Sequence, residues 1–161
     1  MERFGMVLDR LNRAVEIIAS GMLTVMVIVI FLQVVFRSMI KSAIPWSEEL
    51  ARYIMVWISF LGAGIAVRRK GHIGVEALVR ALPKVSKRWT LLLANILSMV
   101  FYAAITVLGF GILQVVKGQV SPAMELSMAI PYSAIFTGGM LMLLYSFYDF
   151  LKALRADGEG S

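Results

Sequence analysis

The chain contains 161 residues, of which 60% are hydrophobic and only 16% carry a charged side chain, and its mean hydropathy is +0.82. Soluble domains are usually about 45–50% apolar and about 25% charged, and a domain of this length cannot bury such an excess in one core. The absence of cysteine excludes disulfides and thiolate sites, a single histidine excludes sites built mainly from histidines, and the net charge of +6 leaves membranes and nucleic acids as possible contacts.

Four apolar segments follow one another along the chain, and each can cross a hydrocarbon core of about 30 Å, which takes about 20 helical residues. The second segment reaches spanning length only if its helix begins near Glu48 and includes Arg52. Pro131 is expected in the first turn of the fourth helix, where its missing N–H costs little. The chain is therefore predicted to be an all-α integral membrane protein with one domain of four transmembrane helices, at about residues 15–36, 48–67, 89–116 and 130–151.

Two shorter stretches are amphipathic, and each predicts a short helix lying in the membrane interface. Their apolar side chains recur with spacings of three and four residues, at Phe4, Val7, Leu8 and Leu11 and again at Val75, Leu78, Val79 and Leu82. For the N-terminal stretch the alternative is a cytosolic extension of the first span. Residues 156–161 are expected to form a disordered cytoplasmic tail.

The basic residues are distributed unequally between the two sides of the predicted membrane. The N-terminal segment, the loop between the second and third spans and the C-terminal tail together hold twelve Lys and Arg residues. The other two loops hold three, or four if Arg52 is counted. The positive-inside rule then places both termini in the cytoplasm. Since the basic residues flank the spans, where they meet anionic headgroups, their expected partners are membrane lipids and not nucleic acid.

The start of the second span carries the most informative polar residues. Ser47 is expected to cap the helix, and Glu48 and Glu49 then fall in the first turn, where the helix dipole favours negative charge. Arg52 follows them by four and three residues, so either carboxylate can pair with it. One interpretation is a well-capped helix with Trp46 as an interfacial anchor. The other is a helix face that contacts a partner, because ions at membrane depth seldom face lipid.

Three further residues are candidates of less specific kinds. His72, just past the second span, is either a pH switch or, more simply, a hydrogen-bonding group at headgroup level. Gly62 and Gly64 predict either a close helix approach or ordinary transmembrane glycines.

The spans contain neither an ionisable residue near the midplane nor a sign of a broken helix, features that carriers normally need. The chain is therefore predicted not to transport a substrate by itself.

The segment from Trp46 to Leu82 resembles the DctQ-like small permease subunit of TRAP (tripartite ATP-independent periplasmic) transporters. Its matching elements are Trp46-Ser47-Glu48-Glu49 with Arg52, then Trp57, Phe60-Leu61-Gly62-Ala63 and Gly71-His72-Ile73. The second half agrees more loosely, through Ser121-Pro122-Ala123, Ile130-Pro131 and Gly138-Gly139. Val75-Glu76 stands where the family often has an aspartate.

This resemblance implies a scaffold subunit of the bacterial inner membrane, without enzymatic activity or cofactor. Such subunits pair with a large multi-spanning permease subunit that imports an organic acid together with sodium. A soluble periplasmic binding protein delivers the acid, of the C4-dicarboxylate or sialic acid type, and the small subunit helps to dock it. The resemblance makes seven residues candidates for the partner interface: Trp46, Glu48, Glu49, Arg52, Trp57, Gly62 and His72.

Two other classes of four-helix membrane protein were weighed against this one. A stand-alone exporter that acts as a homo-oligomer needs a carboxylate deep in its first span, whereas Glu16 lies near the end of that span. Membrane redox enzymes need haem-ligating histidines or paired cysteines, and the chain has neither. The exporter remains the alternative hypothesis.

Overall fold

The computed structural model describes residues 2–40, 45–69 and 84–156, and over these residues the chain forms four α-helices. Each helix contains a segment long and apolar enough to cross a membrane. The prediction of an all-α membrane protein with four spans is therefore confirmed. The helices are α1 (Glu2–Ile40), α2 (Pro45–Arg68), α4 (Lys84–Val116) and α5 (Ala129–Ala156).

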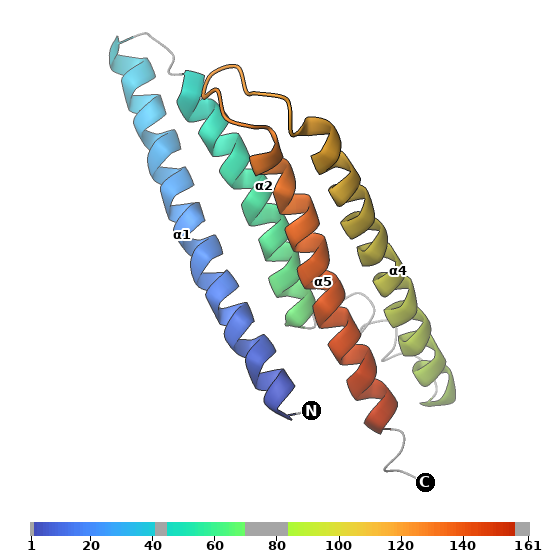
Figure 1. Ribbon diagram of the computed structural model, residues 1–161. Helices are drawn as coiled ribbons and strands as arrows, with labels where there is room; N and C mark the ends of the chain where they lie inside the picture. Colours follow the sequence, from blue (N-terminus) through green and yellow to red (C-terminus); the bar gives the residue numbers. More distant parts are fainter. Residues whose placement is uncertain (1, 41–44, 70–83, 157–161) are drawn as a thin grey trace.

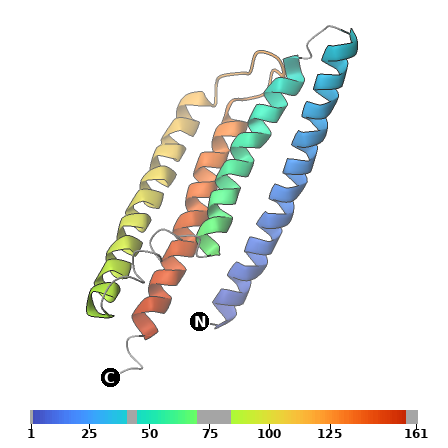
Figure 2. The same cartoon turned by 180° about the vertical axis from the view of Figure 1, so that it is seen from behind.

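The four helices stand side by side in a row, in the order α1, α2, α5, α4 (Figure 1). The view from behind shows the same order (Figure 2). α5 is the most enclosed, since 39% of its apolar span is buried, against 11% for α1 and for α4. We call the end where α1 begins and α5 ends the termini end, and the end where α2 begins and α4 ends the far end. A row leaves every helix a broad face open to lipid or to a partner.

α1 is one continuous helix, so the N-terminal stretch extends the first span and forms no separate interfacial helix. Within this extension Phe4 and Val7 are 44% and 59% exposed, whereas Leu8 is buried. α1 packs against α2 and α5 through a stripe that includes Leu8, Asn12 and Val15. The second amphipathic stretch, Val75 to Leu82, lies outside the described residues, as do residues 157–161 of the predicted tail.

Three glycines bring the helix backbones close together around α5. A Cβ atom at Gly138 would lie 2.6 Å from the Cβ of Phe60 in α2, and one at Gly139 would lie 2.8 Å from the hydroxyl of Thr106 in α4. A Cβ atom at Gly109 of α4 would lie 3.0 Å from a backbone nitrogen of α5. Small residues allow this close packing, which replaces the hydrophobic effect as the force between helices in lipid. The close approach predicted at Gly62 does not occur among the described residues, since none of their atoms lies within 4 Å of a Cβ built there.

Candidate functional site

The first turns of α2 lie at the far end, beside the connection between α4 and α5 (Figure 1). The helix begins at Pro45, three residues before the start predicted from the apolar pattern. Proline suits the first helical position because the N–H it lacks would have no acceptor in the helix. Ser47 consequently lies inside the helix and does not cap it, and it is only 3% exposed.

Glu49 fastens the α4–α5 connection to α2. One carboxylate oxygen accepts hydrogen bonds from the backbone N–H groups of Ala123, at 2.9 Å, and Met124, at 3.1 Å. The other oxygen accepts a hydrogen bond from the hydroxyl of Tyr53. Glu49 is 8% exposed, and it satisfies two successive backbone donors that would otherwise lack a partner. The carboxylate of Glu49 therefore stabilises the fold of this chain by holding the connection against α2.

The connection held by Glu49 is itself compact. An isolated β-bridge joins Val120 to Ser127, and the buried Ser121 exchanges hydrogen bonds with Leu126 through its backbone and its hydroxyl. Glu125 has a φ of 54°, a left-handed conformation that is uncommon for residues other than glycine. Val120 is 69% exposed beside this turn. The connection thus presents an ordered, partly apolar tip at the far end.

Glu48 and Arg52 pair with each other on the exposed side of α2. The two side chains form an ion pair at 3.2 Å and are 66% and 64% exposed. Arg52 therefore pairs with Glu48, because Glu49 is turned toward the α4–α5 connection. Among the aromatic candidates, Trp46 is 49% exposed, whereas Trp57 donates its indole N–H to the carbonyl of Ile130 in α5 at 3.1 Å.

The Glu48–Arg52 pair begins a stripe of exposed residues, together with the half-buried Gly62, that runs along α2 with spacings of three and four. Ser59 in this stripe satisfies its hydroxyl by donating to the carbonyl of Met55 at 2.8 Å, and Gly62 has open space above it. Most exposed residues of α4 are instead bulky and apolar, such as Leu97 and Val107, at 68% and 70%. We call the stripe on α2 the α2 outer face: Glu48, Arg52, Met55, Ser59, Gly62 and Ala66.

A hollow of about 850 Å³ opens beside the first turns of α2. Its walls come from α2, from the α4–α5 connection and from the start of α5, through Trp46, Arg52, Pro122 and Tyr132 among others. The hollow is bordered by both the exposed ion pair and the connection that Glu49 holds. The ion pair and the connection therefore belong to one continuous surface at the far end.

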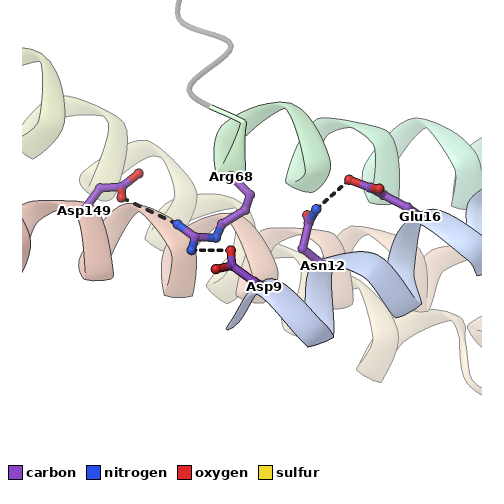
Figure 3. Close-up of polar contacts among 5 residues, drawn as sticks. All are labelled: Asp9, Asn12, Glu16, Arg68 and Asp149. Atoms are coloured by element: carbon purple, nitrogen blue, oxygen red, sulfur yellow. Dashed lines mark hydrogen bonds and ion pairs between the residues drawn. The ribbon is translucent and has the colours of Figure 1, made fainter. Parts of the chain in front are cut away.

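A second polar group, at the termini end, joins α1, α2 and α5 (Figure 3). Arg68 of α2 lies 2.6 Å from Asp9 of α1 and 3.8 Å from Asp149 of α5, and its guanidinium lies 5.1 Å from the ring centre of Tyr148. Arg69 pairs with Glu16 at 2.9 Å. From the sequence these two arginines were counted only as topology signals, and nothing in their spacing indicates partners on α1 and α5. His72 lies outside the described residues.

Between these two ends the helices offer no acid–base or metal chemistry. Residues 17–36, 53–67, 89–116 and 129–148 contain no Asp, Glu, Lys, Arg or His. The polar groups there make structural contacts, such as the hydrogen bond from Ser146 of α5 to Asn95 of α4 at 3.3 Å. In the part of the chain that the structure describes, no three His, Cys, Asp or Glu residues are grouped as metal ligands would be.

We predict that Glu49→Gln lowers the melting temperature of the detergent-solubilised chain more than Glu48→Gln does. An amide keeps one acceptor oxygen and turns an NH₂ donor toward groups that are themselves donors. Glu48 makes only an exposed ion pair within one helix, which contributes little to stability. The two variants remove the same charge one residue apart, so each controls for the other. Equal shifts would contradict a fastening role for Glu49.

Comparison with known proteins identifies related sequences. A family model described as tripartite ATP-independent periplasmic transporters, DctQ component, matches residues 26–156. One Haemophilus influenzae protein named as a TRAP transporter small permease protein is 41% identical over 73 residues, which are 45% of this chain and 45% of that protein. A second so named from this organism is 25% identical over 152 residues, 92% of this chain and 90% of its own length.

A longer relative is the isethionate TRAP transporter permease protein DctMQ of Oleidesulfovibrio alaskensis. It is 26% identical over 149 residues, which are 88% of this chain but only 23% of that protein. Two further matches are named as small permease proteins for sialic acid, in Vibrio cholerae, and for C4-dicarboxylates, in Rhodobacter capsulatus. This chain spans about half or less of the length of several of these relatives.

Proposed function

Since this chain belongs to the DctQ component family of the tripartite ATP-independent periplasmic transporters, we propose that it is the scaffold subunit that holds a large permease subunit in the bacterial inner membrane. The resemblance inferred from the residues around Trp46 is confirmed by the family match. The family is a transporter component and not an enzyme, and the chain is a multi-pass membrane protein.

The observation that carries this proposal is the exposed ion pair of Glu48 and Arg52, within a helix that is long and apolar enough to span a membrane. Ions at membrane depth usually face a protein partner or water and not lipid. Apart from Met55, the rest of the α2 outer face consists of the small residues Ser59, Gly62 and Ala66, which favour close contact with another helix. The relative DctMQ supports a large partner, because its DctQ-like part belongs to a chain several times longer.

We assign the candidate interface residues different roles in this contact. Glu48, Arg52 and Gly62 lie on the α2 outer face and meet the large subunit directly, with Trp46 at its edge. Glu49 and Trp57 act indirectly, because their polar groups are hydrogen-bonded within the chain. His72 stays a candidate from the sequence. The bulky outer side chains of α4 face lipid.

The proposed complex imports an organic acid together with sodium, and a soluble periplasmic binding protein delivers the acid. Three relatives support an acidic substrate, since they are named for sialic acid, C4-dicarboxylates and isethionate. The α4–α5 connection is the proposed docking element for the binding protein. Its support is the ordered turn held by Glu49, with Val120 exposed at the tip.

We propose that the termini end lies in the cytoplasm, from the excess of basic residues on that side. The chain has no natural cysteine, so single cysteines report topology without background. Val120→Cys should react with an impermeant maleimide in cells whose outer membrane alone is opened. Lys152→Cys, also exposed, should react only after the inner membrane is opened. The reverse pattern would overturn this orientation.

The proposed function is tested by reconstitution into liposomes with a sodium gradient. The chain alone should transport no organic acid, because its spans hold no charged residue near the midplane. Uptake should require the chain, the large subunit and the binding protein together. Sodium-driven transport by the chain alone would contradict the scaffold role and favour the exporter. Such an exporter would use the carboxylate of Glu16, which in this structure is bound to Arg69 and Asn12.

A further inference from the structure

Three buried polar atoms at the termini end have no hydrogen-bond partner among the described residues. They are the side-chain oxygen of Asn12 on α1, the Nε atom of Arg68 on α2 and the hydroxyl of Tyr145 on α5. Asn12 is 8% exposed and Tyr145 is fully buried. Buried polar atoms are nearly always hydrogen-bonded to protein or to ordered water, because an orphaned group loses its hydration without compensation.

The three atoms come from three helices to one region. Asn12 lies between Arg68 and Glu16, and its amide NH₂ donates to Glu16 at 2.6 Å (Figure 3). Tyr145 packs in one buried cluster with Leu8, one turn before Asn12, and with Val67, which directly precedes Arg68. Leu8 and Val67 thus bring Asn12 and Arg68 into the neighbourhood of Tyr145.

We propose that an ordered water molecule is bound between Asn12, Arg68 and Tyr145. A buried water makes about three hydrogen bonds to groups that otherwise lack partners. Here Arg68 supplies a donor, Asn12 an acceptor and the Tyr145 hydroxyl a group that can do either. The water completes a polar network that fixes α1 to α2 and α5 at the termini end, where Asp9 and Asp149 also bind Arg68.

Water fits this place better than a charged ligand does. An anion such as a lipid phosphate would meet the carboxylates of Asp9, Glu16 and Asp149 in the same region. A metal cation would face the guanidinium of Arg68, which offers only donors. A neutral molecule that both donates and accepts matches the three atoms.

The direction in which Tyr145→Phe shifts the melting temperature tests this proposal. If the Tyr145 hydroxyl binds the water, Tyr145→Phe lowers the apparent melting temperature of the detergent-solubilised full chain, by about 2–4 °C for one lost hydrogen bond. If the hydroxyl is an orphan, the same change removes a buried unsatisfied group and raises the melting temperature or leaves it unchanged. Circular dichroism at 25 °C checks that the variant keeps its helices.

A double-mutant comparison separates a shared water from an independent effect of Tyr145. In an Asn12→Ala background, Tyr145→Phe should cost less than it does in the wild-type chain, because the water has already lost one partner. Tyr102→Phe is the matched control: Tyr102 lies in the same buried cluster, and its hydroxyl is bonded to Ser98. Its effect should add to that of Asn12→Ala. A Tyr145 effect that is equally additive, or positive in sign, would overturn the proposal.

Discussion

Replacing Gly62 by leucine should abolish recovery of the large permease subunit on a tagged chain, while the melting temperature of the isolated chain stays unchanged or rises slightly. Among the described residues no atom lies within 4 Å of a Cβ built at Gly62, so the first carbon of a larger side chain meets no steric conflict there. Leucine also favours a helix over glycine. On the proposed interface, however, the added side chain would hold the partner helix away from the α2 outer face.

Gly111→Leu provides the matched control for this prediction. Gly111 is an exposed glycine in the last two turns of the apolar helix α4, and a Cβ built there also meets no atom of the described residues within 4 Å. It lies on α4, which we assign to lipid, so recovery of the large subunit should equal that of the wild type. Equal losses at both positions would contradict the assignment of the interface to α2.

Arg52→Ala should reduce recovery of the large subunit by more than a hundredfold under stringent washing. The contact would then contain the carboxylate of Glu48 without its cation, and removing one partner of a buried ion pair costs about 3–5 kcal/mol. The isolated chain should scarcely change, since its Glu48–Arg52 pair is exposed, and exposed pairs four residues apart on a helix contribute about 0.3–0.5 kcal/mol. Tag pull-down and thermal melting measure the two effects separately.

A charge rescue shows whether Arg52 acts through Glu48. The double variant Glu48→Gln with Arg52→Ala should recover part of the lost large subunit, because no carboxylate is then left uncompensated. Lys117→Ala is the control for loss of a cation at the far end: Lys117 follows α4 and is exposed. Wild-type recovery with Arg52→Ala would mean that the ion pair only stabilises the start of α2.

The spans could be predicted from the sequence because lipid imposes a simple rule on composition. The residues of each predicted span lie inside one helix, and Pro131 lies in the first turn of α5 as expected. The start of α2 was placed too late because hydropathy does not register that Pro45 and Trp46 already have helical conformation. Helix ends depend on local backbone geometry, which hydropathy does not describe.

The roles of individual polar residues depended on distant parts of the chain and could not be predicted. Glu48 and Glu49 are adjacent residues of the same type, so the sequence does not distinguish them. Only Glu49 accepts a hydrogen bond from the connection, at Ala123, which lies 74 residues later in the sequence. Arg68 bears the same charge as its neighbours in the basic segment, yet it alone pairs with both α1 and α5 among the described residues. The order of helices in the row decides these contacts, and no periodicity encodes that order.

The glycines show the same limit. Gly62 and Gly138 are both transmembrane glycines, yet only Gly138 lies against another backbone of this chain, that of Phe60. Sequence spacing indicates that a glycine permits close packing, whereas the structure shows which glycines have a neighbour. Gly62 is a candidate for the partner interface because it has no such neighbour among the described residues and lies on the same stripe of α2 as the exposed ion pair.

The central claim is that the α2 outer face binds the large permease subunit, and site-specific photo-crosslinking in native membranes tests it most directly. A photoreactive amino acid is placed at Ser59 on this face and, as a control, at Val107 on α4, which is 70% exposed. We predict that Ser59 crosslinks to the large subunit and that Val107 crosslinks to no protein. Crosslinking of the large subunit at Val107 and not at Ser59, or of Ser59 only to a second copy of this chain, would contradict the account.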